Sequence, residues 1–273
     1  MPELPEVETI RRTLAERVTD LRIEEIRLIW SSAVCGWEDQ SFETLVTGRQ
    51  IKTIDRRGKY LLIRLDKDLT LIAHMRMTGR LNYYSETKEP EKHTHVVFRL
   101  EQGEVHFSDT RKFGRIQAIP TPLCLSGSSL GKLGPEPLEA EFTPEVLKER
   151  FGKKKLSIKA ALLDQHVLAG LGNIYVDESL FQAGISPERG VDTLSKLEIS
   201  ILHRAIKNIL QAGIDAQGTS FRDYRDANGE KGFFEQDLQV YGRGGQPCKV
   251  CGQTLERIRL AGRTTVYCSR CQR

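Results

Sequence analysis

Hydrophobic positions at the start of the chain predict an amphipathic helix. Val7, Ile10, Leu14 and Val18 are three and four residues apart, so they share one face of a helix. The Pro-Glu-Leu-Pro-Glu run before them suits a first helical turn, because proline is tolerated there and carboxylates interact favourably with the helix dipole. On these grounds alone, residues 2–6 are no more than a helix start.

The residues that follow, up to 119, favour strands. Short runs with alternating, β-branched or aromatic positions are separated by turn sequences such as Asp-Lys-Asp and Glu-Gln-Gly. About eight short strands behind one helix predict a β-sandwich. The expected strands include residues 22–30, 44–54, 60–65, 69–74, 95–100, 104–108 and 115–119.

The pattern changes between residues 120 and 140, where proline, glycine and serine are concentrated. Regular structure is unfavourable in such a segment, so it predicts a connection between domains. Helical spacing follows, with a glycine-rich turn at 168–173, and a polar segment at 218–232 is expected to be a mobile loop. The expected helices are 144–151, 157–165, 174–183 and 194–211, and a strand is expected at 233–241.

These elements predict an α+β protein with several domains. A β-sandwich with a leading helix would occupy residues 1–130, and residues 131–142 would link it to a helical domain at 143–232. The remaining residues, 233–273, would form a separate finger.

Composition excludes several classes of protein. The 273 residues are 39% hydrophobic, with a mean hydropathy of −0.39 and no apolar run near the ~20 residues of a membrane span. The N-terminal segment is acidic and helical, unlike a secretory signal, so we expect a cytoplasmic protein without a membrane partner. The net charge is +4, but residues 242–273 contain seven Lys or Arg and one acid. The basic excess therefore lies in the tail and predicts a polyanion partner there.

Four cysteines in this tail predict a zinc site. Cys248 and Cys251 form one CxxC pair, and Cys268 and Cys271 form a second pair after sixteen intervening residues. Two such pairs complete a tetrahedron of thiolates that leaves no position for water, so the expected Zn²⁺ is structural. Disulfides are the alternative, and they fit poorly with a chain that lacks a secretory signal.

Two features of the C-terminal half suit phosphate binding. The hairpin expected between the cysteine pairs has Arg263 at its tip, where the side chain could reach a phosphate. An ordinary solvated surface arginine is an equally good interpretation of this residue. The turn ending at Asn173 presents backbone N–H groups at a helix start, which bind anions, and the Asn173 amide could donate to the same anion. Helix, turn, helix and lysines together predict nucleic-acid contacts, including contacts from Lys153 and Lys159, with an ordinary helical hairpin as the alternative. The lysines before the turn are Lys153, Lys154, Lys155 and Lys159.

Three loops of the expected sandwich carry further candidates. Lys59 follows Asp-Arg-Arg-Gly at the edge of a core strand, where burial can make an amine chemically active. Arg111 and Phe113 lie two residues apart on one loop and could enter a duplex together, one by hydrogen bonding and one by stacking. The run from His74 to Met77 forms another loop. Core filling is the alternative for Met77 and Phe113.

The first residues also have chemistry of their own. If Met1 is removed, Pro2 becomes the N-terminus and carries a secondary amine. α-Amino groups titrate near pKa ~8, so more of this amine is uncharged at neutral pH than for a lysine. Such an amine can attack an aldehyde-like carbon to form an iminium, and Glu3 beside it could move protons.

Taken together, these motifs resemble the formamidopyrimidine-DNA glycosylases, a family of bacterial base-excision repair enzymes. The resemblance extends over the whole chain and keeps the order of the motifs. They are PELPEVE at 2–8, RRGKYL at 56–61, HMRMTG at 74–79, EKHTHV at 91–96, DTRKFG at 109–114, LGPEPL at 133–138, AGLGNIYVDESLF at 169–181, QVYGR at 239–243 and the two cysteine pairs.

The resemblance implies a β-sandwich, a helix–two-turns–helix domain and a zinc-ribbon finger, acting as a monomer on double-stranded DNA with a damaged base. Pro2 would attack C1′ of a nucleotide flipped out of the stack, and Glu3 would serve as acid and base. The iminium would allow β- and then δ-elimination, assisted by Lys59 and Arg263 respectively. The expected lesions are oxidised purines, namely 8-oxoguanine and formamidopyrimidines.

The same resemblance implies which residues contact DNA. Contacts are implied for His74, His93, Arg111, Lys153, Asn173 and Arg263. Met77, Arg111 and Phe113 would fill the gap left by the flipped base. The segment 218–232 would close on oxidised guanine, and its expected lesion-recognition residues are Thr219, Ser220, Arg222 and Tyr224.

Two alternatives remain open at this point. Endonuclease VIII-like glycosylases share the N-terminal proline, the fold and often the ribbon, but they prefer oxidised pyrimidines. Leu4, the RRGKYL run and the loops around Met77 and Phe113 favour the purine branch. A zinc-ribbon nucleic-acid-binding protein without catalysis would use the same basic groups and would form no covalent intermediate.

Overall fold

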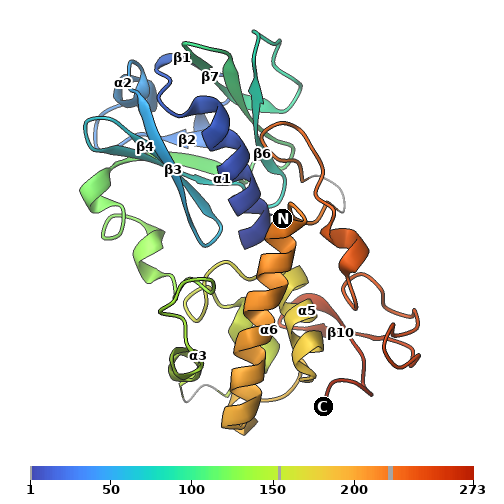
Figure 1. Cartoon of the computed structure of the whole chain (residues 1–273). Helices are drawn as coiled ribbons and strands as arrows, with labels where there is room; N and C mark the ends of the chain where they lie inside the picture. Colours follow the sequence, from blue (N-terminus) through green and yellow to red (C-terminus); the bar gives the residue numbers. More distant parts are fainter. Residues whose placement is uncertain (1, 153–154, 221–223) are drawn as a thin grey trace. The chain divides into compact units, whose positions relative to one another are not determined.

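The computed structural model describes residues 2–152, 155–220 and 224–273. Contacts within it divide the chain into two compact units (Figure 1). One unit comprises Met1–Gly131 with Ala216–Phe233, and the other comprises Lys132–Asp215 with Phe234–Arg273. Residues 216–233 therefore group with the N-terminal unit, whereas the sequence led us to expect 218–232 in the helical domain.

The first unit contains two sheets and the leading helix α1 (Leu4–Val18). Neighbouring strands are antiparallel except for the short parallel pair of β2 (Val34–Cys35) and β9 (Arg115–Pro120). One sheet has the order β1 (Ile23–Leu28), β7 (Thr94–Leu100), β8 (Glu104–Asp109) and β6 (Gly79–Tyr84). The other has the order β2 (Val34–Cys35), β9 (Arg115–Pro120), β5 (Leu69–His74), β4 (Tyr60–Leu65) and β3 (Ile51–Arg57). Short helices are α2 (Phe42–Val46), η1 (Ser31–Ala33), η2 (Thr121–Leu123) and η3 (Ser129–Lys132).

One hydrophobic core joins both sheets to α1. Leu71 of one sheet, Phe107 of the other and Ile10 of the helix belong to the same buried cluster. The helix face predicted from the sequence is the face that is buried there, since Val7, Ile10, Leu14 and Val18 are each 1% exposed. Burial of these side chains supplies most of the stability of such an amphipathic helix. The predicted sandwich with a leading helix is confirmed.

Three local predictions were wrong. Residues 42–46 form helix α2 instead of the start of a strand, because the Ser41 hydroxyl caps the helix by accepting the Thr44 N–H at 3.2 Å. Strand β6 was missed because its first residues were interpreted as the end of a loop. Residues 233–241 form the turn η5 (Phe234–Asp237) and a loop, because backbone N–H groups at 239–241 donate to a carboxylate in place of a strand partner.

The described parts of segment 218–232 have fixed contacts on the sandwich. Tyr224 and Ala227 are 8% and 0% exposed and belong to the sandwich core. The Ala227 carbonyl accepts the Tyr83 N–H at 2.8 Å, and its own N–H donates to the Thr13 hydroxyl at 3.2 Å. The part of this expected loop around Ala227 is therefore held between α1 and β6.

The second unit is helical and ends in a hairpin. Its helices are α3 (Pro144–Phe151), α4 (Ile158–Leu163), α5 (Asn173–Ala183), α6 (Lys196–Asp215) and the single turns η4 (Val191–Thr193) and η5; its strands are β10 (Glu256–Leu260) and β11 (Arg263–Tyr267). Side chains of Thr143 and Ser157 cap α3 and α4. The Gln165 side chain fixes the double turn before α5 by donating to the Leu171 carbonyl (2.8 Å) and accepting the Gly170 N–H (3.0 Å). No helix in the described part of the chain is long and apolar enough to cross a membrane.

Candidate active site and nucleic-acid interface

Pro2 and Glu3 are buried and anchored. Pro2 is buried, Glu3 is 2% exposed, and Glu3 has an extended backbone that precedes the first turn of α1. The Glu6 carboxylate accepts the Glu3 N–H at 2.8 Å, which closes one side of a capping box. This contact fixes the backbone directly after Pro2, whereas residues near a chain end are often poorly ordered.

Glu6 also connects the start of α1 to Thr219 and Tyr224. Its second oxygen accepts the Thr219 N–H at 2.7 Å, and the Tyr224 hydroxyl donates to the Glu6 carbonyl at 3.4 Å. Gly218 has a φ of +86°, and a Cβ there would lie 2.9 Å from the Glu6 Cγ, so this position requires glycine. Two of the predicted lesion-recognition residues, Thr219 and Tyr224, therefore lie at the start of α1.

The predicted lesion-recognition residues have different surroundings. The Tyr224 ring is part of the sandwich core, and burial followed by the nearby Glu6 charge raises the pKa of its hydroxyl. The Ser220 hydroxyl donates to the Tyr224 carbonyl at 3.2 Å and accepts the Gly232 N–H at 2.9 Å, which closes the segment on itself. Arg222 lies outside the described residues.

Lys59 lies in the tight turn between β3 and β4 and is 7% exposed. The strand before this turn is attached to α1, because Arg56 pairs with Glu8 at 3.2 Å. Burial opposes ionisation of Glu8, but hydrogen bonds from Arg11 and Arg12 outweigh it and lower the pKa of the carboxyl. The turn that carries Lys59 is thus fixed to α1, the helix that directly follows Pro2 and Glu3.

His74 ends β5 beside this turn. Its ring contacts the Tyr60 ring edge-on at 4.5 Å, and its Nδ1 accepts the Arg76 N–H at 2.9 Å. Burial, followed by the positive charges of Arg76 and Lys59, lowers the pKa of His74 to about 3. The imidazole is therefore neutral near pH 7 and can contact DNA by hydrogen bonding but not as a cation.

The residues predicted to fill the gap in the duplex lie together on the surface. The Arg111 guanidinium donates to the Met77 sulfur at 2.9 Å and lies over the Phe113 ring at 5.0 Å. Met77 is 39% and Phe113 is 51% exposed, so neither fills the core. We call Met77, Arg111 and Phe113 the wedge. Exposed apolar side chains around a cation are suited to insertion between bases.

Asp109 organises the wedge, although no pattern in the sequence led us to single it out. Its carboxylate is 1% exposed and accepts the N–H groups of Arg111, Phe113 and Gly114 at 3.1, 2.8 and 2.6 Å, together with the Thr78 hydroxyl. Burial opposes ionisation, but these donors prevail and lower the pKa of the carboxyl. An aspartate directly before a polar loop often bonds to N–H groups a few residues ahead, and that pattern could have identified it.

His93 lies beside this loop and is partly exposed. Its backbone carbonyl accepts the Asp109 N–H at 3.0 Å. The first unit thus places three of the predicted DNA contacts, His74, His93 and Arg111, around the same two loops.

In the second unit, Asn173 and Arg263 come close together. Asn173 is the first residue of α5, and its side-chain amide donates to the Thr264 carbonyl at 2.8 Å. The neighbouring Arg263 is exposed and follows a tip of two residues with positive φ, Ala261 and Gly262. The predicted phosphate ligands therefore belong to one surface. Lys153 lies outside the described residues.

The prediction that Lys159 contacts DNA is wrong. Its side chain is 0% exposed, and its ammonium donates to Asp177 at 2.6 Å and to the Thr264 carbonyl at 3.4 Å. A lysine is buried in this way only when a partner offsets the loss of hydration, and Asp177 is that partner. Lys159 is a structural residue of the interior.

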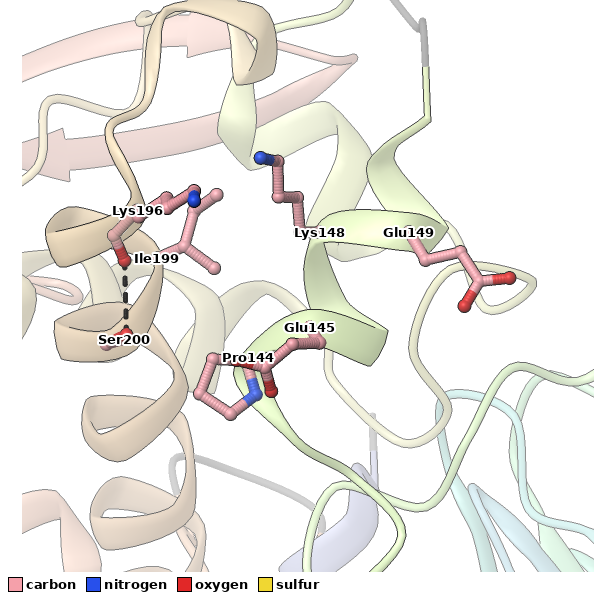
Figure 2. A pocket seen from close by; sticks show the side chains of 7 residues that line it. All are labelled: Pro144, Glu145, Lys148, Glu149, Lys196, Ile199 and Ser200. Atoms are coloured by element: carbon pink, nitrogen blue, oxygen red, sulfur yellow. Dashed lines mark hydrogen bonds between the residues drawn. The ribbon is translucent and has the colours of Figure 1, made fainter.

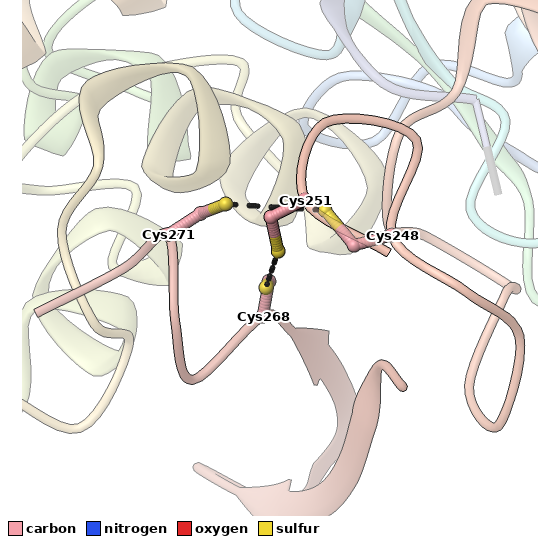
Figure 3. Close-up of side chains that lie close together, drawn as sticks. All are labelled: Cys248, Cys251, Cys268 and Cys271. Carbon is pink, nitrogen blue, oxygen red and sulfur yellow. Dashed lines mark hydrogen bonds between the residues drawn. The ribbon is translucent and has the colours of Figure 1, made fainter. Parts of the chain in front are cut away.

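The four cysteines of the tail fit a zinc ion. Their sulfur atoms all lie within 4.8 Å of one another (Figure 3). Cys251 and Cys268 have sulfurs 3.5 Å apart, and Cys248 and Cys271 have sulfurs 4.0 Å apart. Tetrahedral Zn–S bonds of ~2.3 Å place sulfurs roughly 3.8 Å apart, whereas a disulfide would require about 2 Å. The arrangement matches a structural Zn²⁺ with four protein ligands.

A cavity of about 450 Å³ between α3 and α6 lacks the character of an active site (Figure 2). Lys148 and Lys196 point toward the same space, and the Ser200 hydroxyl donates to the Lys196 carbonyl at 3.1 Å. Its charged side chains are exposed and of both signs. Active sites usually contain buried groups with strongly shifted pKa values, and those of this chain lie elsewhere.

A sandwich led by a proline-initiated helix, a double turn between two helices and a four-cysteine hairpin define the helix–two-turns–helix class of proteins. Family models agree with this class over most of the chain. Residues 1–116 match the formamidopyrimidine-DNA glycosylase N-terminal domain, 133–225 the corresponding H2TH domain and 245–273 a zinc finger found in FPG and IleRS. The chain belongs to the formamidopyrimidine-DNA glycosylase family.

Relatives and solved structures match the chain over its full length. A formamidopyrimidine-DNA glycosylase of Desulfitobacterium hafniense is 58% identical over 272 residues and is covered completely, and one from Geobacillus kaustophilus is 46% identical over 275 residues. A crystal structure of a Lactococcus lactis FPG mutant with Fapy-dG-containing DNA has a TM-score of 0.92 at 39% identity, with both chains covered completely. The Lactococcus lactis Fpg with abasic-site DNA gives the same TM-score and identity over 99% of both chains.

Proposed function

We propose that this protein removes oxidised purines from duplex DNA and then cuts the strand at the resulting abasic site. The full-length match to structures solved with lesion-containing DNA supports this proposal most directly. The buried, anchored start at Pro2 and Glu3 supports the chemistry, because a fixed amine with an adjacent carboxylate is what an iminium mechanism requires.

Pro2 acts as the nucleophile after Met1 is removed. Its nitrogen bonds to C1′ while the bond from C1′ to the damaged base breaks, and Glu3 transfers the protons needed for base departure and ring opening. The iminium acidifies the sugar, so β-elimination breaks the bond to the 3′ phosphate and δ-elimination breaks the bond to the 5′ phosphate. Lys59 assists the first elimination and Arg263 the second.

The remaining site residues bind the DNA and deform it. Extrusion of a nucleotide costs a few kcal/mol, and the exposed wedge offsets part of that cost by filling the gap. The phosphate ligands in this proposal are Asn173 and Arg263 in the helical unit and His74 in the sandwich. His93, Arg111 and Lys153 make further contacts to the DNA. Four residues remain candidates for lesion contacts, namely Thr219, Ser220, Arg222 and Tyr224.

The zinc site contributes by structure and not by chemistry. Cys248, Cys251, Cys268 and Cys271 would supply all four ligands and would hold the ion at the base of the hairpin that carries Arg263. We propose that the enzyme acts as a monomer in the cytoplasm, where the chromosome of a bacterium is accessible.

Cleavage of defined duplexes tests the proposal. The protein should cut DNA with 8-oxoguanine opposite cytosine faster than DNA with thymine glycol, and leave phosphates on both sides of a one-nucleotide gap. Faster cutting of thymine glycol would favour the endonuclease VIII-like alternative. Tight binding to both duplexes without cleavage would favour a non-catalytic nucleic-acid-binding protein.

A further inference from the structure

Helix α5 presents two consecutive buried carboxylates to the finger. Asp177 and Glu178 are 2% and 1% exposed. Glu178 accepts three backbone N–H groups at 2.8–2.9 Å, from Gln239, Val240 and Tyr241. These residues lie in the first part of the finger, before the cysteine pairs, so Glu178 attaches that part of the finger to α5.

Asp177 attaches the other side of the finger, close to Arg263. One carboxylate oxygen accepts the Lys159 ammonium at 2.6 Å, and the other accepts the Val266 N–H of β11 at 3.3 Å. Lys159 also donates to the Thr264 carbonyl at 3.4 Å. Asp177 and Lys159 therefore bond to strand β11 at two nearby backbone positions on the same edge.

The Thr264 carbonyl is shared with a predicted phosphate ligand. It accepts the Asn173 side-chain amide at 2.8 Å in addition to the Lys159 ammonium. Thr264 directly follows Arg263, so the backbone next to Arg263 is held by one donor from α4 and one from α5. The network therefore sets the position of the Arg263 backbone relative to the start of α5.

The hairpin needs such an external support. It has two strands of five residues, β10 and β11, which pair from Glu256–Tyr267 to Leu260–Arg263. An isolated two-stranded hairpin is marginally stable at best. The cysteines fix its open end, where Cys268 directly follows β11, but the tip at Ala261 and Gly262 lies at the opposite end. Figure 1 shows the hairpin beside α5, which β11 contacts.

We propose that the buried Lys159–Asp177 pair is a positioning device that holds the Arg263 guanidinium in place for δ-elimination through the backbone of Thr264 and Val266. This inference rests on the function proposed above for Arg263. Stability alone explains the pair poorly, because apolar residues of similar volume usually replace a buried ion pair at little cost or with a gain. Geometric precision explains it better, since a displacement of 1 Å at a reacting group can reduce a rate by about a hundredfold.

A double substitution separates burial from positioning. Lys159→Met with Asp177→Leu fills the same interior space with apolar side chains but removes every hydrogen bond from the pair to β11. The matched control is Arg189→Gln with Glu198→Gln, which removes an ion pair of the same unit whose side chains are 27% and 30% exposed. Zinc content, thermal unfolding and rates on a duplex with a preformed abasic site are measured for each protein, together with base excision from an 8-oxoguanine duplex.

The double variant should bind one zinc ion and should lose at least about tenfold in the rate of δ-elimination, whereas β-elimination and base excision change less than about threefold. The control should match the wild type in all three rates. The inference would be overturned if the double variant carried out both eliminations at the wild-type rates. It would also be overturned if base excision, β-elimination and δ-elimination were all slowed by the same factor. A wild-type protein without strand cleavage would instead refute the proposed function itself.

A mutant cycle that includes Arg263→Ala provides a second, independent test of the inference. If the pair acts through Arg263, the δ-elimination loss from the double substitution should disappear in an Arg263→Ala background, because coupled residues are non-additive. Additive losses would overturn the inference. Asp177→Asn keeps the side-chain volume and is taken through the same cycle, so a folding defect in the double variant does not remove the test.

Discussion

Asp109 takes no part in the proposed chemistry, yet the wedge depends on it. Replacement of Asp109 by Asn keeps the volume but removes charge-assisted hydrogen bonds to the Thr78 hydroxyl and three N–H groups. We expect the free energy of unfolding to fall by about 2 kcal/mol, and capture of 8-oxoguanine to slow because the wedge no longer keeps its shape. Urea denaturation and stopped-flow fluorescence of labelled duplex measure the two effects. Unchanged stability together with unchanged capture would show that Asp109 does not organise the loop.

Phe113 allows a cleaner test of the wedge, because its side chain is half exposed and contributes little to folding. Phe113→Ala should change the free energy of unfolding by less than about 0.5 kcal/mol. It should slow processing of 8-oxoguanine more than processing of an abasic site, where no base has to be extruded. Equal slowing on the two substrates would show that Phe113 does not act in extrusion.

His74 should give the protein a distinct pH dependence of stability. Its pKa is lowered from 6.5 to about 3, so between these values the unfolded chain binds a proton that the folded chain does not. The stabilisation is complete above pH 6.5 and is lost as the pH falls toward 3, at up to about 1.4 kcal/mol per pH unit. His74→Gln should lack this component when urea unfolding is measured from pH 7 to pH 4. An imidazole that titrates near pH 6.5 by NMR in the folded protein would contradict the proposed burial of a neutral ring.

Burial of single polar residues was the hardest property to predict. The lysines before the glycine-rich turn look alike in sequence, but Lys159 is fully buried and Lys155 is exposed. The difference comes from Asp177, which lies 18 residues further along the chain and reaches Lys159 only after α4 and α5 have packed together. Spacing within one segment carries no information about such a partner.

At the scale of whole elements, hydrophobic periodicity predicted those helices and strands whose formation depends on burying an apolar face. Helix α1 and the central strands β4, β5 and β7 have strong apolar patterns, and each was found at or near its predicted bounds. Helix α2 was missed because it is short and its cap competes with the alternating pattern. Strand β6 was missed because its first residues were interpreted as the end of the preceding loop. The segment 233–241 was mistaken for a strand because its hydrogen-bond acceptor, Glu178, lies on a distant helix.

The finger should depend on zinc while the sandwich should not. The finger core is small and includes the ligands Cys248 and Cys268, whereas the sandwich core, within the described residues, contains no cysteine. Removal of zinc by a chelator should therefore unfold the hairpin and weaken binding to lesion-containing DNA at least about tenfold, with recovery when zinc is restored. The dispersed amide resonances of the folded sandwich should persist in heteronuclear NMR spectra. Full DNA affinity in the zinc-free protein would contradict the proposed role of the hairpin.

For the whole molecule, phosphate binding should make DNA affinity strongly dependent on salt. Removal of one phosphate-binding cation should reduce the slope of log K against log salt concentration by about 0.9, and Arg263→Ala should produce one such reduction. Arg99→Gln serves as the control, because Arg99 is already paired with Glu25 at 3.1 Å on the sandwich. An unchanged slope for Arg263→Ala would show that Arg263 does not bind a phosphate in the complex.

The central claim is that the nitrogen of Pro2 forms the covalent bond to the damaged nucleotide. Borohydride reduces an iminium to a stable amine, so incubation with 8-oxoguanine duplex and borohydride should yield one cross-linked species. Mass spectrometry of its peptides should locate the DNA on the N-terminal proline, and protein that retains Met1 should not react. Folded protein that binds the duplex but gives no adduct, or an adduct on Lys59 instead of Pro2, would contradict this claim.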